Sequence, residues 1–205
     1  MPSSTFFHLP EAKREKLLLA AREEFARVPY DEASINRMIR AAGIPRGSFY
    51  MYFDGKDDLF RYLLEDSFQQ VIQKLRALLQ EKQGDLFGAF RGLFDCLLET
   101  RQQGSSSVEA LSAMLRLNAG VQQGPLLRSI DPSRLMESIL PEIDCDRLSL
   151  QREGDLEEIV FILISITMPM IWSALDQDVD LIREHYLARL DILSRGMAAK
   201  SAAML

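Results

Sequence analysis

The sequence has few of the residues on which disulfide frameworks, metal clusters and most catalytic sites depend. Its 205 residues include only two cysteines, Cys96 and Cys145, with no CxxC or Cys/His spacing around them. This pattern predicts no metal site and no cofactor, and it favours a reducing, cytoplasmic setting. The two histidines, His8 and His185, belong to no metalloprotease motif. There is also no phosphate-binding loop and no nucleophile motif, so we expect that the chain is not an enzyme.

Signals for β-strands and for membrane segments are also scarce. No Asn-Gly or Asp-Gly pair joins two alternating apolar runs, so the sequence predicts an all-α fold. The N-terminus has no charged segment followed by a long apolar stretch, and it does not resemble a secretory signal. One apolar run, residues 159–175, is too short to span a bilayer, contains Pro169 and has acidic flanks. It predicts a buried helix, and we expect no membrane partner.

The sequence has fewer basic residues than acidic ones, with a net charge of −6. Residues 1–66 carry 10 Lys/Arg against 11 Asp/Glu, and residues 67–205 carry 14 against 19. The window 34–56 differs, because it has four basic residues and a single acidic one, Asp54. The excess of acid therefore lies in the C-terminal part, and the local field around residues 34–56 is positive.

Helical signals recur along the whole chain. Proline at a first helical position, serine at an N-cap and glycine at a C-terminus mark the first elements. The expected helices run from Pro10 to before Pro29, with Leu17, Leu18, Ala21 and Phe25 as the apolar stripe, from Ser34 to Gly43, from Pro45 to Tyr52, from Lys56 to Glu81, and then over about 85–103, 106–118, 124–143, 155–175 and 179–196. We expect two domains, a small one over residues 1–55 and a helical bundle over residues 56–205.

The second and third of these helices form a pair joined by a short turn at Gly43, which is the arrangement of a helix-turn-helix motif. This spacing alone occurs in many helical pairs without any role in DNA binding. The exposed face adds information, because Arg46, Gly47 and Ser48 begin the third helix, where a helix in the major groove touches bases. Arginine is the residue that most often reads guanine, and glycine allows a close backbone approach.

The segment LLLAAREEFARVPYDEASINRMIRAAGIPRGSFYMYFDGKDDLF, residues 17–60, resembles the DNA-binding domain of the tetracycline-repressor (TetR) family. The resemblance includes Phe25, Tyr30, the Ala-Gly-Ile turn at 42–44, and the Gly-Ser-Phe-Tyr run at 47–50. It implies a three-helix helix-turn-helix domain followed by a helical ligand-binding and dimerisation domain. It also implies a homodimer that binds palindromic, double-stranded operator DNA and is released by a small-molecule effector.

The resemblance further implies which residues contact DNA. Expected phosphate contacts come from Ser34, Arg37, Tyr50, Tyr52 and Lys56, and expected approaches to base edges come from Asn36, Arg46, Gly47 and Ser48. Two positions depart from the family's pattern. Pro45 stands where the family often has serine, and Tyr52 stands where it usually has histidine. Both departures bear on the operator sequence more than on DNA binding itself.

The C-terminal part supplies candidates for dimerisation and ligand binding. The apolar segment 159–175 and the amphipathic segment 179–196, with Leu181, Tyr186, Leu190 and Leu193 on one side, resemble the two helices through which TetR-type proteins dimerise. The candidate ligand contacts are Phe94, Met114, Asn118, Met168 and Trp172. Further residues that could line a cavity are Phe87, Phe90, Leu117 and Met170. Ordinary core packing explains most of these residues equally well.

The sequence thus favours a DNA-binding transcriptional regulator, most simply a repressor. The alternative is a helical adaptor that binds only other proteins, which would leave the surface of Arg46, Tyr50, Tyr52 and Lys56 unexplained. Under the adaptor hypothesis, neutralising this surface leaves DNA affinity unchanged. Under the regulator hypothesis, Arg46→Ala relaxes the preference for one base of the operator.

Overall fold

The computed structural model describes residues 2–102, 117, 137–173 and 178–198. Within these ranges the chain forms helices and connecting loops but no strand, and one isolated bridge joins Leu148 to Ala198. The predicted all-α class is confirmed. The chain divides into two compact units, whose described parts are essentially residues 2–69 and residues 70–198. The boundary between the two units falls within the long helix α5, at Gln69.

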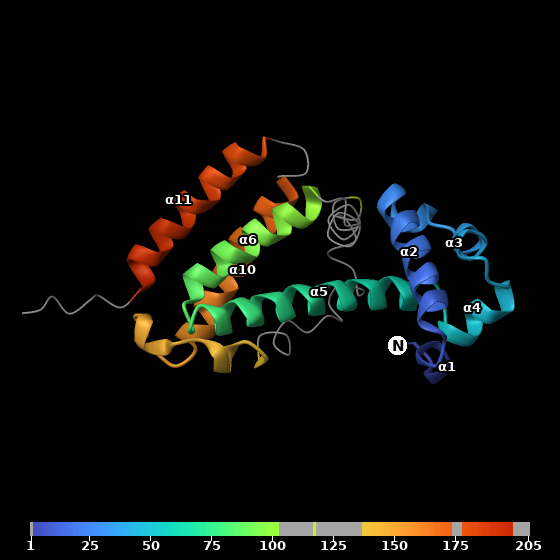
Figure 1. Ribbon diagram of the computed structural model, residues 1–205, viewed down its shortest axis with the longest axis horizontal. Coiled ribbons are helices and arrows are strands. Elements are labelled where there is room, and N and C mark those ends of the chain that lie inside the picture. Colours follow the sequence, from blue (N-terminus) through green and yellow to red (C-terminus); the bar gives the residue numbers. More distant parts are fainter. Residues whose placement is uncertain (1, 103–116, 118–136, 174–177, 199–205) are drawn as a thin grey trace, which may run out of the picture. The chain divides into compact units, whose positions relative to one another are not determined.

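The helices follow the expected bounds closely (Figure 1). Those of the first unit are α1 (Ser4–Phe7), α2 (Glu11–Arg27), the 3-10 helix η1 (Tyr30–Glu32), α3 (Ile35–Ala42), α4 (Arg46–Tyr52) and the first part of α5 (Lys56–Glu81). Those of the second unit are the rest of α5, α6 (Leu86–Gln102), the 3-10 helices η3 (Leu140–Glu142) and η4 (Cys145–Arg147), α10 (Asp155–Ser173) and α11 (Val179–Met197).

The core of the first unit consists largely of aromatic rings and the apolar stripe of α2. Leu17, Ala21 and Phe25 are fully buried, as their 3.6-residue spacing predicts. Phe25 packs edge-on against Phe60 of α5, with ring centroids 4.9 Å apart, and Tyr30 lies 5.1 Å from the same ring. The stripe therefore fixes α2 against the beginning of α5.

The short helix α1 was not expected from the sequence. Its Phe6 is fully buried, and its ring centroid lies 4.8 Å from that of Phe53 and 5.3 Å from that of Tyr62. Four residues are too few to show a helical period, so the sequence pattern gives no signal for this element. α1 closes the end of the core formed by α4 and α5.

The turn between α3 and α4 depends on Gly43. This residue has φ +68°, a left-handed backbone conformation that is strained for any residue other than glycine. The amide of Gly43 donates to the carbonyl of Arg40, and the amide of Ile44 donates to the carbonyl of Ile39. These bonds end α3 and allow α4 to begin at Arg46.

In the second unit α6, α10 and α11 pack against one another (Figure 1). Tyr186 of α11 is fully buried there, and its ring stacks on that of Phe94 of α6 with centroids 4.0 Å apart. Ile182, Tyr186 and Leu190 form the buried side of α11, because positions four apart share one face. Leu181, which we expected on the same side of the helix as Tyr186, is 47% exposed, so the two residues lie on different sides of α11.

The C-terminal end of another expected helix is also different. Residues 138–143 form a turn and the 3-10 helix η3 instead of the end of an α-helix over 124–143. Pro141 has no amide hydrogen for an α-helical bond, and Ile139 and Ile143 are buried on either side of it. The expected helix 106–118 lies almost entirely outside the described residues, as does the first part of 124–143.

The length and apolarity needed to cross a bilayer are not combined in any helix of the described ranges, α10 included.

Candidate nucleic-acid interface

Glu24, a buried carboxylate at the end of α2, holds α3 in place. Glu24 Oε1 accepts from the backbone amide of Ser34 at 2.9 Å and from Arg37 Nε at 2.8 Å, and Oε2 accepts from Arg27 at 2.6 Å. Glu24 is only 6% exposed, whereas about half of each arginine side chain reaches solvent. Glu24 thus accepts from the amide of the N-cap residue Ser34, whose own hydroxyl makes no capping hydrogen bond.

The ionisation of Glu24 follows from these contacts. Burial opposes the charged form, but hydrogen bonds from the two guanidiniums and the Ser34 amide hold the pKa of Glu24 below its ordinary value. Glu24 is therefore a carboxylate at neutral pH. No sequence motif marks this residue, since its partners lie up to 13 positions away in the chain.

Arg37 and Lys56, two of the expected phosphate contacts, use their charged groups within the first unit. Arg37 also donates to the carbonyl of Glu32 at 3.1 Å. Lys56 Nζ donates to the carbonyls of Tyr30, Asp31 and Ala33 at 2.6, 3.2 and 3.3 Å, so all three ammonium hydrogens have partners. Both side chains fix the η1 segment that precedes α3. Their contact with phosphate stays a prediction.

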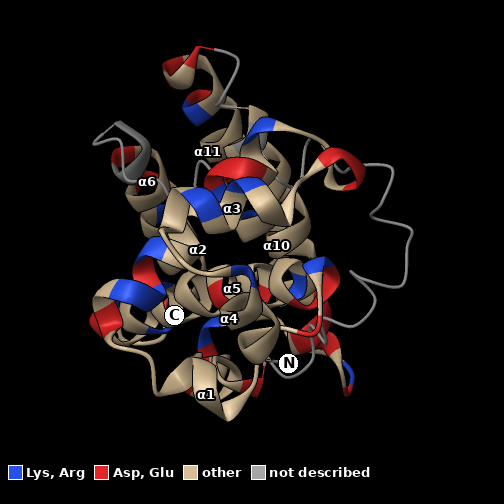
Figure 2. Ribbon diagram, turned by 90° about the vertical axis from the view of Figure 1, so that its right-hand side faces the viewer, with Lys and Arg blue, Asp and Glu red and all other residues tan. Residues whose placement is uncertain are grey.

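Asn36, Arg46 and Tyr50 lie together on the exposed side of α3 and α4. Arg46 Nη1 donates to Asn36 Oδ1 at 3.0 Å, and the Arg46 Cζ lies 6.0 Å from the centroid of the Tyr50 ring. Tyr50 is 48% exposed, although its neighbour Phe49 is fully buried. We call these three residues the reading cluster. Figure 2 views the chain from the side on which α3 and α4 lie, with basic residues in blue.

Gly47 and Ser48 occupy the first turn of α4 beside this cluster. A Cβ added at Gly47 would meet no atom within 4 Å, so the backbone here faces open space. Ser48 is half-buried, and its amide donates to the carbonyl of Pro45 at 3.0 Å, which closes the first turn. Another surface could therefore approach the backbone of Gly47 closely.

The C-terminal end of α4 is held by a segment that the sequence reading missed. The Ser3 amide donates to the carbonyl of Tyr52 at 2.9 Å, and the Ser3 hydroxyl donates to that of Met51 at 2.5 Å. The Tyr52 ring, half-buried, lies 6.4 Å from that of Phe6. These contacts hold the C-terminal end of α4 against the N-terminal segment.

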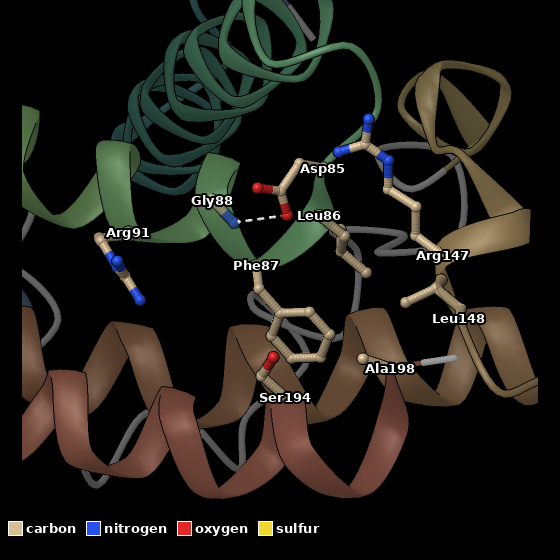
Figure 3. Close-up of a pocket in the computed structure, with 9 residues that line it drawn as sticks. All are labelled: Asp85, Leu86, Phe87, Gly88, Arg91, Arg147, Leu148, Ser194 and Ala198. Atoms are coloured by element: carbon tan, nitrogen blue, oxygen red, sulfur yellow. Dashed lines mark hydrogen bonds between the residues drawn. The ribbon is translucent and has the colours of Figure 1, made fainter. Parts of the chain in front are cut away.

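The second unit contains a hollow of about 230 Å³ between the beginning of α6, η4 and the end of α11 (Figure 3). It has both polar and apolar walls. The lining residues are Asp85, Leu86, Phe87, Gly88, Arg91, Arg147, Leu148, Ser194 and Ala198. Phe87, one of the residues that the sequence suggested could line a cavity, is among these lining residues. Its charged side chains are those of Asp85, Arg91 and Arg147, and Arg147 is paired with Asp144 at 2.9 Å.

The five candidate ligand contacts lie elsewhere or outside the described residues. Phe94 is fully buried against Tyr186, which gives it a role in the core. Met168 is half-buried on α10. Trp172 lies on α10, but its side chain is outside the described part, and so are Met114 and Asn118. Within the described residues there is also no group of three side chains suited to hold a metal ion.

Part of the first unit is similar to a known family. Residues 17–63 match the sequence profile of the bacterial regulatory proteins of the tetR family. Over 68 residues the chain is 34% identical to the HTH-type transcriptional regulator YdgC of Bacillus subtilis, covering 33% of the chain and 35% of that protein. Over 71 residues it is 35% identical to the HTH-type transcriptional repressor Rv1474c of Mycobacterium tuberculosis, covering 35% and 37%. The chain thus matches just over a third of the length of these curated relatives.

The fold of the whole chain is similar to that of solved regulators. One is SmeT, the repressor of the Stenotrophomonas maltophilia multidrug efflux pump SmeDEF, solved in complex with triclosan. The two proteins are 19% identical, with 95% of each chain covered and a TM-score of 0.68. At this identity the similarity establishes the fold, an N-terminal helix-turn-helix followed by a helical domain.

Proposed function

We propose that this chain, which carries the N-terminal domain of the tetR family, is a transcriptional regulator that places α4 in the major groove of operator DNA. The observation that carries the proposal is the reading cluster of Asn36, Arg46 and Tyr50, exposed on the two helices of the helix-turn-helix. A guanidinium at the N-terminus of the second helix is well placed to donate to base edges. The resemblance of residues 17–63 to a family of regulators supports the same function.

The contacts expected from the family resemblance fall into two groups. We propose that Asn36, Arg46, Gly47 and Ser48 face the bases, because they cluster at the beginning of α4 or directly beside it. Phosphate contacts are proposed for Ser34, Arg37, Tyr50, Tyr52 and Lys56. Contacts of the second kind position a protein on DNA without reading its sequence.

A homodimer is proposed because one small helix-turn-helix gives too few contacts for specific affinity. Two helices of the second unit support this. Phe161 on α10 is 57% exposed, and Leu181 and Ile192 on α11 are 47% and 61% exposed. Large apolar side chains on these two helices suit an interface that buries them in a second copy. Such a dimer would present two α4 helices to a palindromic operator about one DNA turn, roughly 35 Å, apart.

A small-molecule effector is the second part of the proposal. SmeT, which shares the fold, has been solved with triclosan, and the second unit of this chain has a hollow lined by Phe87, Arg91 and Arg147. Because α5 runs from the first unit into the second, a ligand bound in the second unit can act on the first through this helix. A ligand that prefers the DNA-incompetent state would release the operator. The regulator would then work in the cytoplasm as a ligand-controlled repressor.

Fluorescence anisotropy tests the central proposal. The full chain is titrated onto labelled DNA from upstream of its own gene at several salt concentrations, with a scrambled duplex as control. We expect tight, sequence-selective binding that weakens steeply with salt. Absence of binding even at low salt would overturn the proposal and favour a protein-binding adaptor.

Two arginine variants sharpen this experiment. Arg46→Ala should weaken binding to the selected duplex by about tenfold or more, as expected for a lost bidentate base contact. Arg152→Ala removes the same charge from an exposed loop before α10 and should leave affinity unchanged. Equal effects of the two substitutions would show that only net charge matters. Addition of triclosan to the bound complex is a first probe of release by an effector.

A further inference from the structure

The contact between Asn36 and Arg46 restricts what either side chain can offer to DNA. Asn36 lies in the first turn of α3, and Arg46 is the first residue of α4. Both side chains are exposed, and Arg46 Nη1 donates to Asn36 Oδ1 at 3.0 Å. The bond therefore links the two helices of the helix-turn-helix on the surface proposed to face DNA.

The direction of this hydrogen bond is fixed by chemistry. A guanidinium has only donors, so the amide of Asn36 must turn its oxygen toward Arg46. This bond orients the Asn36 amide and ties its oxygen to the guanidinium. Asn36 is thereby a fixed partner of Arg46 at the start of α4.

Tyr50 confines the guanidinium from another direction. Its ring centroid lies 6.0 Å from Arg46 Cζ, at the limit of a cation–π contact, and Tyr50 itself packs edge-on against buried Phe49 with centroids 5.3 Å apart. The guanidinium is thus held between an amide and an aromatic ring. Its bond to Asn36 involves Nη1 and leaves Nη2 and Nε to donate to a base.

We infer that Asn36 positions Arg46, so that Nε and Nη2 of the guanidinium both face one base of the operator half-site and that base is guanine. Guanine offers two acceptors, N7 and O6, on its major-groove edge. Adenine and cytosine each expose an amino donor there, which would meet another donor. Asn36 is in this scheme a positioning residue for Arg46. The inference rests on the proposed function.

The experiment selects duplexes from a pool with a randomised half-site, using the full chain, and then measures the affinity for all four base pairs at each selected position. We expect wild type to prefer guanine at one position by about tenfold or more. Arg46→Ala should abolish that preference. Asn36→Ala should reduce it at the same position by about threefold to tenfold, the size of one lost hydrogen bond. In the double variant the loss of Asn36 should have no further effect there.

A conservative variant separates positioning from a merely structural role. Asn36→Asp keeps an acceptor for Arg46, so the guanine preference should persist although the added negative charge lowers affinity for every duplex. Replacing the guanine by 7-deazaguanine removes N7 and should weaken wild type but not Arg46→Ala. Thermal unfolding of each variant checks that the exposed substitutions leave the fold intact.

Two further outcomes would overturn different claims. An adenine preference at another base pair, lost in Asn36→Ala while the guanine preference stays, would overturn the inference but not the proposed function. Failure to select any duplex at low salt would instead overturn the proposed function.

Discussion

Lys56 Nζ lies 2.6 Å from the carbonyl oxygen of Tyr30 and 4.4 Å from the centroid of the ring of the same residue. One ammonium thus contacts both the backbone and the π-face of the residue that begins η1. A positive charge at the N-terminus of α5 is unfavourable toward the helix dipole and needs compensation. Within the first unit, three carbonyl oxygens provide that compensation.

The first prediction concerns this lysine. Lys56→Met keeps most of the apolar stem but removes all three hydrogen bonds, and we expect it to lower the free energy of unfolding by about 1.5–3 kcal/mol. Chemical denaturation measures this loss. A phosphate contact would in addition lower the salt slope of DNA binding by about 1. An altered salt slope with unchanged stability would contradict the internal role of Lys56.

Gly47→Ala should separate stability from DNA binding. The added methyl meets no atom within 4 Å in the free protein, and alanine in a helix is more stable than glycine by about 0.5–1 kcal/mol. We therefore expect a slightly higher Tm together with weaker binding to the selected duplex, because the methyl projects toward the DNA. A variant with raised Tm and unchanged affinity would show that the backbone of Gly47 does not approach DNA.

The contacts of Glu24 predict a pH dependence. The pKa of this carboxyl is lower in the folded protein than its ordinary value of 4.5, so the protonated form favours unfolding. Its contribution to stability is present above pH 4.5 and is lost as the pH falls through the folded-state pKa. Glu24→Gln should be less stable than wild type at neutral pH, and the difference should shrink in acid. A difference that stays constant from pH 7 to pH 3, measured by urea unfolding, would contradict this assignment.

Tyr186→Phe tests the polar contact buried in the second unit. The Tyr186 hydroxyl lies 2.9 Å from Thr167 Oγ1 and 3.1 Å from the carbonyl of Phe90, and burial raises its pKa. Removing this hydroxyl should cost about 0.5–1.5 kcal/mol of unfolding free energy. A double-mutant cycle with Thr167→Val should show coupling between the two positions. Tyr50→Phe, at an exposed tyrosine, is the matched control and should leave stability unchanged.

Replacing exposed apolar residues of α10 and α11 by glutamate tests the proposed dimer. Phe161→Glu and Ile192→Glu should each convert the protein to a monomer at concentrations where wild type is dimeric, because an interface would bury an unpaired carboxylate. Analytical ultracentrifugation measures the state. Leu19→Glu changes an exposed leucine of α2 in the first unit and should leave the dimer intact. A wild-type monomer at micromolar concentration would contradict the homodimer directly.

Prediction from the sequence succeeded where short-range signals were strong. α5 has the expected bounds, Lys56–Glu81, because acidic residues at its beginning and an unbroken apolar period mark it clearly. It failed where a few residues act through distant partners. The helix around Phe6 is too short to show a period, and Leu181 and Ile182 are both apolar, so the pattern alone could not decide which of them faces the core.

The candidate site shows the same division. The residue types of the reading cluster and the glycine of the turn can be read from the sequence. Their arrangement cannot, because Asn36 and Arg46 are 10 positions apart, and they meet only once Gly43 reverses the chain. The same holds for Glu24 and Arg37, which are 13 positions apart in the chain and form an ion pair within the first unit.

The sequence by itself therefore determined the helical class and the helix-turn-helix pair. These follow from periodicity, capping residues and spacing, which act over a few positions along the chain. Only the tertiary structure decided which charged groups are engaged inside the first unit and which are left for a partner. That choice depends on distances between side chains from different helices, and these distances are set by how the core packs.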